Sequence, residues 1–195
     1  VKFGMVTGDA VYGSSEFAHA LDERRIPFSL DIRGNQRVYL NDPKPCIPQR
    51  NGDTGRSRSV LKTDESSIAV STLAKRIKKH QWSRIDVWKG TKGYIRVDAF
   101  AMRVYFWNAQ YDYAPVEWWL VMIREEGSKD IEFFISNESA AMPLKTLVAK
   151  HRNRYWIERC FQDSKSTIGM ADYQMRKWQG WHHHMSLCML ALLFM

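Results

Sequence analysis

The chain has 195 residues, of which 45% are hydrophobic and 26% charged, so collagen-like, low-complexity and wholly disordered chains are excluded. Lys and Arg number 29 against 21 Asp and Glu, and the net charge of +8 favours a polyanionic partner, with nucleic acid the first candidate. The three cysteines form no CxxC pair, which argues against a disulfide framework or a zinc cluster and fits a reducing cytoplasm. No secretory signal opens the chain, and its longest apolar run is too short for a membrane helix, so no membrane partner is expected.

The first elements predict a strand, a helix and a second strand. Residues 2–8 form a short apolar strand that ends at the pair Gly8-Asp9. Ser14 or Ser15 then caps a helix that runs to Arg25, and residues 26–32 alternate like a strand. Such a unit indicates an α/β sheet at the start of the chain.

The middle of the chain predicts a loop and then a series of strands. Residues 34–67 are rich in Pro and Gly and read as a loop, apart from a short strand at 38–40. A helix is expected at 68–79, strands at 84–88, 94–107, 118–124 and 131–135, and helices from 144 to about 165 and again after Gly169. We therefore expect residues 1–33 and 138–195 to form one core, interrupted by a basic, β-rich insertion at 34–137.

The most informative helix carries four polar residues along one stripe. Glu158 lies four residues after Arg154 and seven before Lys165, and His151 precedes Arg154 by three. One carboxylate among cations suits a site where the acid holds a metal ion and the cations hold phosphate oxygens. An exposed ion pair between Arg154 and Glu158 is the simpler alternative.

Asp9 is the second candidate, because ligands of open α/β sheets gather outside the carboxyl ends of the strands. An aspartate in this place and a glutamate on a helix are able to share a divalent cation. The alternative is that Gly8-Asp9 forms only a turn.

These residues together resemble a known family. The stretch Val6-Thr7-Gly8-Asp9-Ala10-Val11-Tyr12-Gly13, the motif Arg154-Tyr155-Trp156-Ile157-Glu158 with Lys165, and the series Tyr173, Arg176, Trp178, Gly180 and Trp181 are similar to the DDE transposases of bacterial insertion sequences. More narrowly, they are similar to the branch that carries a β-strand insertion and a Tyr-Arg-Glu-Lys helix motif, of which Arg154, Glu158 and Lys165 match three positions. His151 stands at the position of the Tyr.

The resemblance implies an α/β, RNase H-like catalytic core with a mixed sheet and closing helices. Asp9 is then the second catalytic Asp and Glu158 the catalytic Glu, and both hold the two Mg²⁺ or Mn²⁺ ions of the complete site. The implied reaction is metal-dependent cleavage and strand transfer of DNA by two-metal phosphoryl transfer. The implied partners are transposon-end DNA, target DNA and a second transposase subunit, in a bacterial cytoplasm at the nucleoid. Arg154 and Lys165 position the scissile strand, and His151 donates to a phosphate.

In this family the first catalytic Asp lies on an earlier strand, upstream of the position of Val1. We therefore expect a fragment that is inactive alone. Two alternatives stay open: a non-catalytic, DNA-binding relic of a transposase gene, and an unrelated basic α/β protein in which Asp9 and Glu158 never meet.

The expected insertion is the remaining candidate DNA surface. Between residues 75 and 103 nine Lys or Arg stand against two Asp, and Lys89 precedes the turn Gly90-Thr91-Lys92-Gly93, which contains Lys92. Similar transposases stack an insertion tryptophan on a flipped base. The candidates here are Trp82, Trp88, Trp118 and Trp119, although most of these are expected in the core.

Overall fold

The structure is a computed structural model that describes residues 4–48, 59–90, 93–110, 113–174 and 176–194. It divides the chain into two compact units, Val1–His151 and Arg152–Met195. The first unit contains all strands of the described residues, and the second is helical. The predicted α/β class is confirmed: a six-stranded mixed sheet with C-terminal helices is consistent with an RNase H-like fold.

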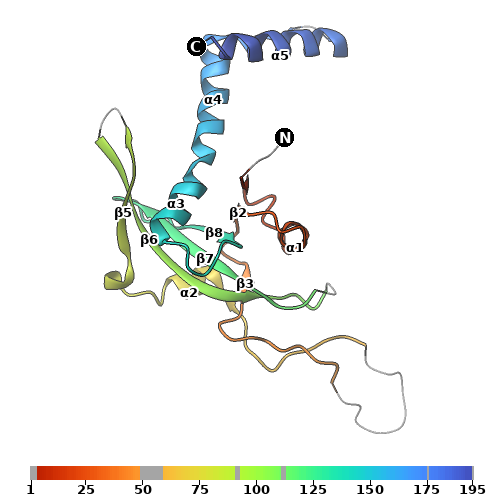
Figure 1. Cartoon of the computed structure of the whole chain (residues 1–195), viewed down its shortest axis with the longest axis vertical. Helices are drawn as coiled ribbons and strands as arrows, with labels where there is room; N and C mark the ends of the chain where they lie inside the picture. Colours follow the sequence, from red (N-terminus) through yellow and green to blue (C-terminus); the bar gives the residue numbers. More distant parts are fainter. Residues whose placement is uncertain (1–3, 49–58, 91–92, 111–112, 175, 195) are drawn as a thin grey trace. The chain divides into compact units, whose positions relative to one another are not determined.

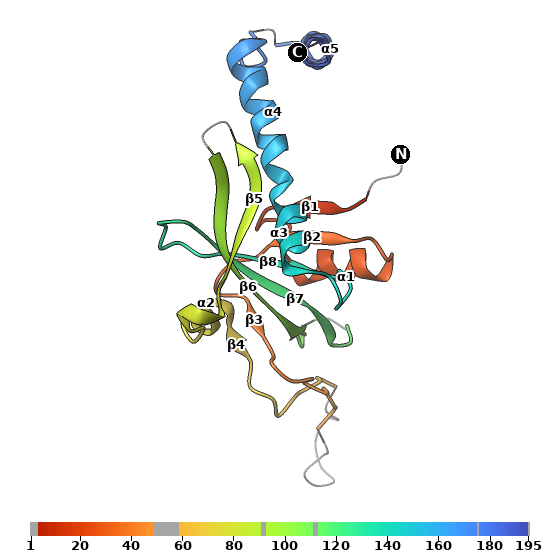
Figure 2. The same cartoon turned by 60° about the vertical axis from the view of Figure 1, so that its left-hand side comes forward.

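The opening strand–helix–strand unit is present as predicted. Strand β1 (Val6–Gly8) and strand β2 (Phe28–Asp31) are parallel, with Gly8 opposite Leu30. Between them runs α1 (Ser15–Glu23), which begins where the Ser14 hydroxyl accepts a hydrogen bond from the amide of Phe17 at 3.3 Å. Figure 2 shows β1 and β2 side by side, with α1 beside β2.

The long strands form an antiparallel meander that joins the opening unit. Strands β5 (Ser83–Gly90), β6 (Gly93–Phe106), β7 (Val116–Glu125) and β8 (Glu132–Ser136) confirm the four predicted strands within a few residues. The sheet order is β1-β2-β8-β7-β6-β5, and β8 pairs antiparallel with β2. Figure 1 shows β6 and β7 running together through the sheet. One continuous sheet therefore contains strands from both the expected core and the expected insertion.

Apolar side chains cover both faces of this sheet. On one face Trp118, Phe28 and Leu30 pack with residues of α1, all almost completely buried. On the other face Phe134 packs with Leu147 and Val148 of α3 (Leu144–Arg152). These clusters hold α3 and α1 on opposite sides of β2 and β8.

The predicted helix at 68–79 is wrong in its extent. Residues Ile68–Ala69 form strand β4, which pairs with β3 (Arg37–Val38) in a small second sheet. Helix α2 covers only Val70–Ala74, and a short 3₁₀ turn follows at Lys79–Gln81. Backbone pairing with β3 takes up the first residues, so the helix starts later than its apolar periodicity indicates.

The predicted helix from 144 to about 165 is interrupted. Helix α3 ends at Arg152 and α4 (Arg154–Thr167) begins after Asn153. The carbonyl of Asn153 accepts a hydrogen bond from the amide of Trp156 at 3.2 Å, a tighter i to i+3 turn than in an α-helix. His151 and Glu158, which the spacing put on one helix, therefore lie on two.

The second unit is completed by α5 (Trp178–Leu192). Gly169 lies after the end of α4 and has a φ of 74°. Its carbonyl oxygen lies 3.1 Å from Nε2 of His184. None of the helices in the described part of the chain has the length and apolar content needed to cross a lipid bilayer.

Candidate active site

Asp9 follows β1 directly and opens a tight turn. Its carboxylate Oδ1 accepts a hydrogen bond from the amide of Val11 at 2.9 Å, and its carbonyl accepts one from the amide of Tyr12 at 3.0 Å. Aspartate favours this conformation, because its side chain replaces a backbone acceptor two residues before the donor. The half-buried carboxylate is therefore held at the carboxyl end of a parallel strand, where open α/β sheets bind ligands.

Two glycines allow the loop that follows Asp9 to pack against β2. A β-carbon on Gly8 would lie 2.9 Å from Cδ2 of Leu30, and one on Gly13 would lie 1.9 Å from the carbonyl oxygen of Asp31. At position 13 only glycine allows the two backbones to approach so closely, whereas the neighbour of Gly8 is the end of a side chain. The pattern Gly8-Asp9 to Gly13 is thus a packing requirement that fixes the loop against the neighbouring strand.

Asp31 ends β2 next to Asp9, because Gly8 and Leu30 are partners in the parallel ladder. Its Oδ1 lies 3.2 Å from Nε2 of His151, and Nδ1 of the same imidazole lies 2.9 Å from the hydroxyl of Ser29. The ring also stacks on Phe134, with centroids 3.9 Å apart and planes 3° from parallel. His151 is only 6% exposed.

This cluster was not found from the sequence. Ser29 and Asp31 are two residues apart on one strand, a spacing that puts both side chains on one face, and that signal was available. The sequence predicted instead that His151 donates to a DNA phosphate. In the structure a phosphate oxygen would have to displace Ser29 or Asp31 to reach either ring nitrogen.

Helix α4 carries the other predicted residues. Nη2 of Arg154 donates to Oε1 of Glu158 at 2.9 Å, so the i,i+4 ion pair that the spacing allowed is present. The Glu158 side chain is 63% exposed, and Lys165 is exposed in the last turn. Arg159 and Asp163 form a second pair at 3.0 Å. Asp9 belongs to the first unit and Glu158 to the second.

Carboxylate oxygens are the ligands that Mg²⁺ and Mn²⁺ prefer, and Asp9 and Glu158 both supply them. Asp9 uses one oxygen for the turn, which orients the carboxylate, as hydrogen bonds to metal-ligating carboxylates do. Among the described residues no three His, Cys, Asp or Glu side chains gather in one place. Taken by itself, each of these two carboxylates has the donor chemistry that a divalent ion takes.

The charges of the β-meander are largely paired across strands. Asp98 accepts hydrogen bonds from Arg124 at 3.0 Å and Arg84 at 3.3 Å, and Asp86 accepts one from Arg96 at 3.0 Å. The bond from Arg124 is the main reason that the pKa of Asp98 is lowered, and Arg84 lowers it further. Some of the Lys and Arg side chains between residues 75 and 103 therefore form ion pairs within the sheet.

The structure describes only some of the other insertion residues that were candidates for DNA contacts. Lys89 lies in β5 opposite Tyr94, and Lys92 lies outside the described residues. Trp118 is a core residue at 1% exposure. Trp119 donates its indole N–H to the carbonyl of Ser139 at 3.0 Å.

Trp82 has a cation on the face of its ring, as Trp119 has with Arg103. The guanidinium carbon of Arg124 lies 4.9 Å from the centre of the Trp82 ring. Because Arg124 also binds Asp98, the indole belongs to the same cross-strand network. Trp82 is half-buried there.

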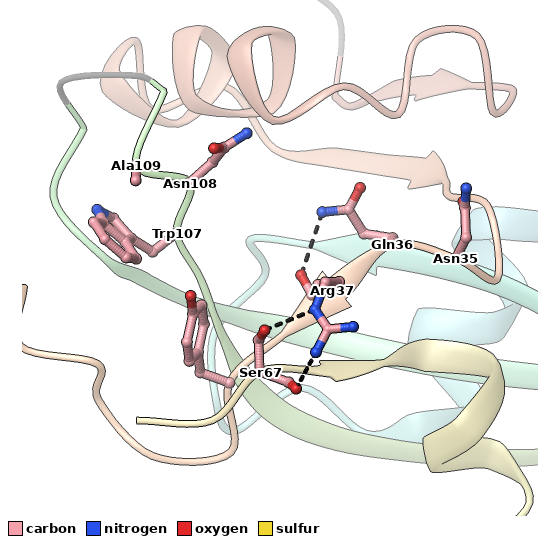
Figure 3. A pocket seen from close by; sticks show the side chains of 8 residues that line it. Asn35, Gln36, Arg37, Ser67, Trp107, Asn108 and Ala109 are labelled. Carbon is pink, nitrogen blue, oxygen red and sulfur yellow. Dashed lines mark hydrogen bonds between the residues drawn. The ribbon is translucent and has the colours of Figure 1, made fainter. Parts of the chain in front are cut away.

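A pocket of about 450 Å³ lies between β3 and the end of β6 (Figure 3). Nε of Arg37 donates to the Ser67 hydroxyl at 2.7 Å and Nη2 to the Ser67 carbonyl at 2.5 Å, so the guanidinium is fixed in the wall. Tyr39 and Trp107 form an aromatic side, with ring centroids 6.1 Å apart. The lining contains no acidic side chain among the described residues.

No curated protein sequence matches the chain significantly. The family model described as the transposase DDE domain matches residues 2–194, almost the whole chain. A match of this extent confirms the resemblance to DDE transposases. The chain belongs to the transposase DDE domain family.

Proposed function

We propose that this chain is the part of an insertion-sequence transposase that supplies the second and third catalytic carboxylates, Asp9 and Glu158. The observation that supports it most is the Asp9 carboxylate, oriented by its own turn at the carboxyl edge of a parallel strand pair in a chain of the DDE family. The substrates are transposon-end and target DNA in a bacterial cytoplasm. A second copy of the transposase completes the synaptic complex.

In this proposal Asp9 and Glu158 hold Mg²⁺ or Mn²⁺, two ions in the complete site. When bound, such ions activate the attacking water or 3′-hydroxyl and stabilise the leaving oxygen. Glu158 has to exchange part of its contact with Arg154 for this role. Arg154 is then released toward a phosphate oxygen of the scissile strand, and Lys165 contributes a second cation.

The family's first catalytic carboxylate is not assigned to any residue of this chain. Two carboxylates bind a divalent ion more weakly than three, so we expect weak binding and no cleavage by these 195 residues alone.

The test is Mn²⁺ binding by the whole chain, measured by calorimetry and by the loss of the free-ion paramagnetic resonance signal. Asp9→Asn keeps the oxygen that accepts the Val11 amide and removes the charge, and Glu158→Gln does the same on α4. We expect both variants to lose most of the Mn²⁺ affinity. Asp163→Asn, which removes another α4 carboxylate, is the matched control and keeps it.

Mn²⁺ affinity that survives Asp9→Asn would contradict the catalytic assignment. Mn²⁺ binding, and not DNA binding, separates the alternative of a non-catalytic relic. A relic binds duplex DNA with a steep salt dependence and has no saturable Mn²⁺ site, whereas Lys165→Gln reduces the salt slope by about one in either case.

A further inference from the structure

The Lys and Arg side chains that follow α2 divide into two groups. Arg84, Arg96 and Arg103 each lie within 3.3 Å of a carboxylate oxygen of a neighbouring strand. The second group is exposed and forms no ion pair within the described part of the chain. Its members are Lys75, Arg76, Lys78 and Lys79. Four positive charges without an ion-pair partner therefore gather within five residues.

These cations lie on a folded segment, residues 75–79, which we call the basic connection. Figure 1 shows it between α2 and β5. The amide of Arg76 donates to the carbonyl of Leu73 at 2.9 Å, which continues the last turn of α2. The amide of Lys78 donates to Oε1 of Gln81 at 2.8 Å, and the amide of Gln81 donates to the carbonyl of Lys78 at 3.0 Å. The backbone of the basic connection is therefore held at both ends by hydrogen bonds.

Two apolar side chains fix the same segment on the sheet. Ile77 and Trp82 are partly buried and pack against the core cluster that contains Leu73. The Trp82 ring also lies 6.4 Å from the ring of Phe100, measured between centroids, and carries Arg124 on its face. A segment anchored in this way keeps its backbone conformation when it binds a partner, so less conformational entropy is lost. The basic connection thus presents its cations from a preformed backbone.

A phosphate backbone is the partner that fits these charges. Duplex DNA carries one negative charge per about 1.7 Å of its axis, so several cations on one short segment can each meet a phosphate. Lysine binds phosphate as a point charge, and the exposed cations do so without breaking an ion pair. Arg84 and Arg96 would first have to give up Asp98 and Asp86. The exposed cations therefore gain more from a polyanion than the paired ones.

We propose that the basic connection is a DNA-backbone surface of the first unit, and that the ion-paired arginines of β5 and β6 add little to DNA affinity. The choice of DNA as the polyanion rests on the proposed function. The division of the cations into two groups does not, because it follows from contacts within the first unit. Contacts of this kind position the duplex and read no base sequence.

The test measures binding of the whole chain to a labelled DNA duplex of mixed sequence by fluorescence anisotropy, in EDTA and over a series of KCl concentrations. Two double variants each remove two positive charges: Lys78→Gln with Lys79→Gln, and Arg84→Gln with Arg96→Gln. We expect the lysine variant to make the slope of log K against log [KCl] less steep by about two. The arginine variant is the control matched in net charge, and it leaves the slope almost unchanged.

Equal slope changes in the two double variants would overturn the proposal, as would an unchanged slope in the lysine variant or a parent chain that binds no duplex. Thermal unfolding shows that each variant folds, and Lys79→Gln against Arg96→Gln serves if the double arginine variant does not. The proposed function fails separately, because Mn²⁺ binding by Asp9 and Glu158 is measured without DNA. A chain that binds duplex through the basic connection but binds no Mn²⁺ keeps this surface and loses the catalytic assignment.

Discussion

The carbonyl oxygen of Asp31 occupies the space that a side chain on Gly13 would need, since a β-carbon there would lie 1.9 Å from it. The loop after Asp9 and the end of β2 are thus in direct backbone contact. This contact fixes two acidic residues, Asp9 and Asp31, at neighbouring strand ends.

Gly13→Ala is the first prediction that follows from this contact. The loop or the strand has to move, and overpacking of this kind costs about 1–3 kcal/mol of unfolding free energy. Urea denaturation measures the loss. Gly4→Ala is the control, because a β-carbon on Gly4 meets no atom within 4 Å, and we expect it to be almost neutral. Equal stability of the two variants would show that the loop is not seated on β2 as described.

Asn137 links three segments of the first unit and predicts a second stability effect. Its Oδ1 accepts from the amide of Phe28 at 2.9 Å, and its Nδ2 donates to Asp22 at 2.8 Å and to the carbonyl of Ile26 at 3.1 Å. Asn137→Ala leaves the Phe28 amide without this acceptor, and we expect a loss of roughly 2–4 kcal/mol in denaturant unfolding. Asn41→Ala removes a single exposed contact of 3.4 Å and should cost far less.

Asp98 gives a prediction in acid. Its pKa is lowered chiefly by the hydrogen bond from Arg124, so the folded state holds the charged form more strongly than the unfolded state does. The stabilisation is present above the ordinary pKa of 3.8 and disappears as the pH falls through the lower folded value. Denaturant unfolding between pH 5 and 2 should therefore show a smaller acid loss in Asp98→Asn than in the parent. An unchanged acid slope in this variant would contradict the assignment.

His19 gives a prediction at milder pH. It is 5% exposed, stacks on Tyr113 with centroids 4.5 Å apart, and burial lowers its pKa below 6.5, although Asp22 and Glu23 oppose the shift. Below about pH 6.5 the unfolded chain gains a proton that the folded chain resists, so stability falls as the pH decreases. His19→Phe removes this dependence, and unfolding free energies at pH 7.5 and 5.5 measure it. A parent chain equally stable at both values would count against a neutral, buried His19.

Much of the fold was predictable because its signals are local. The alternation of residues 26–32 and the capping Ser14 each act within a few residues, and β2 and α1 lie where these signals put them. The turn at Asp9 is of the same kind. Local chemistry is therefore sufficient for the elements and for one half of the candidate site.

The rest depended on partners far apart in the sequence. Helical spacing put His151 and Glu158 on one stripe, but the bonds of His151 to Ser29 and Asp31 cross more than a hundred residues and turn the imidazole inward. Cys160 stands among apolar residues in the sequence and is exposed, because helical spacing does not show which face of α4 is covered. The cations between residues 75 and 103 were predicted for DNA, yet cross-strand register brings one of them, Arg84, to Asp98, which also binds Arg124.

The position of β2 between β1 and β8 has a consequence for the order of folding. Strands β5 to β8 follow one another along the chain and pair as neighbours, so they close short loops. The contact between Phe28 and Asn137, by contrast, spans 109 residues, and closing so long a loop costs more entropy before it gains any contact. We therefore expect the meander to fold first and β1 and β2 to join it last. The edge that carries Asp9 and Asp31 then forms in the final step, and a chain trapped before that step would keep most of its sheet and none of its candidate active site.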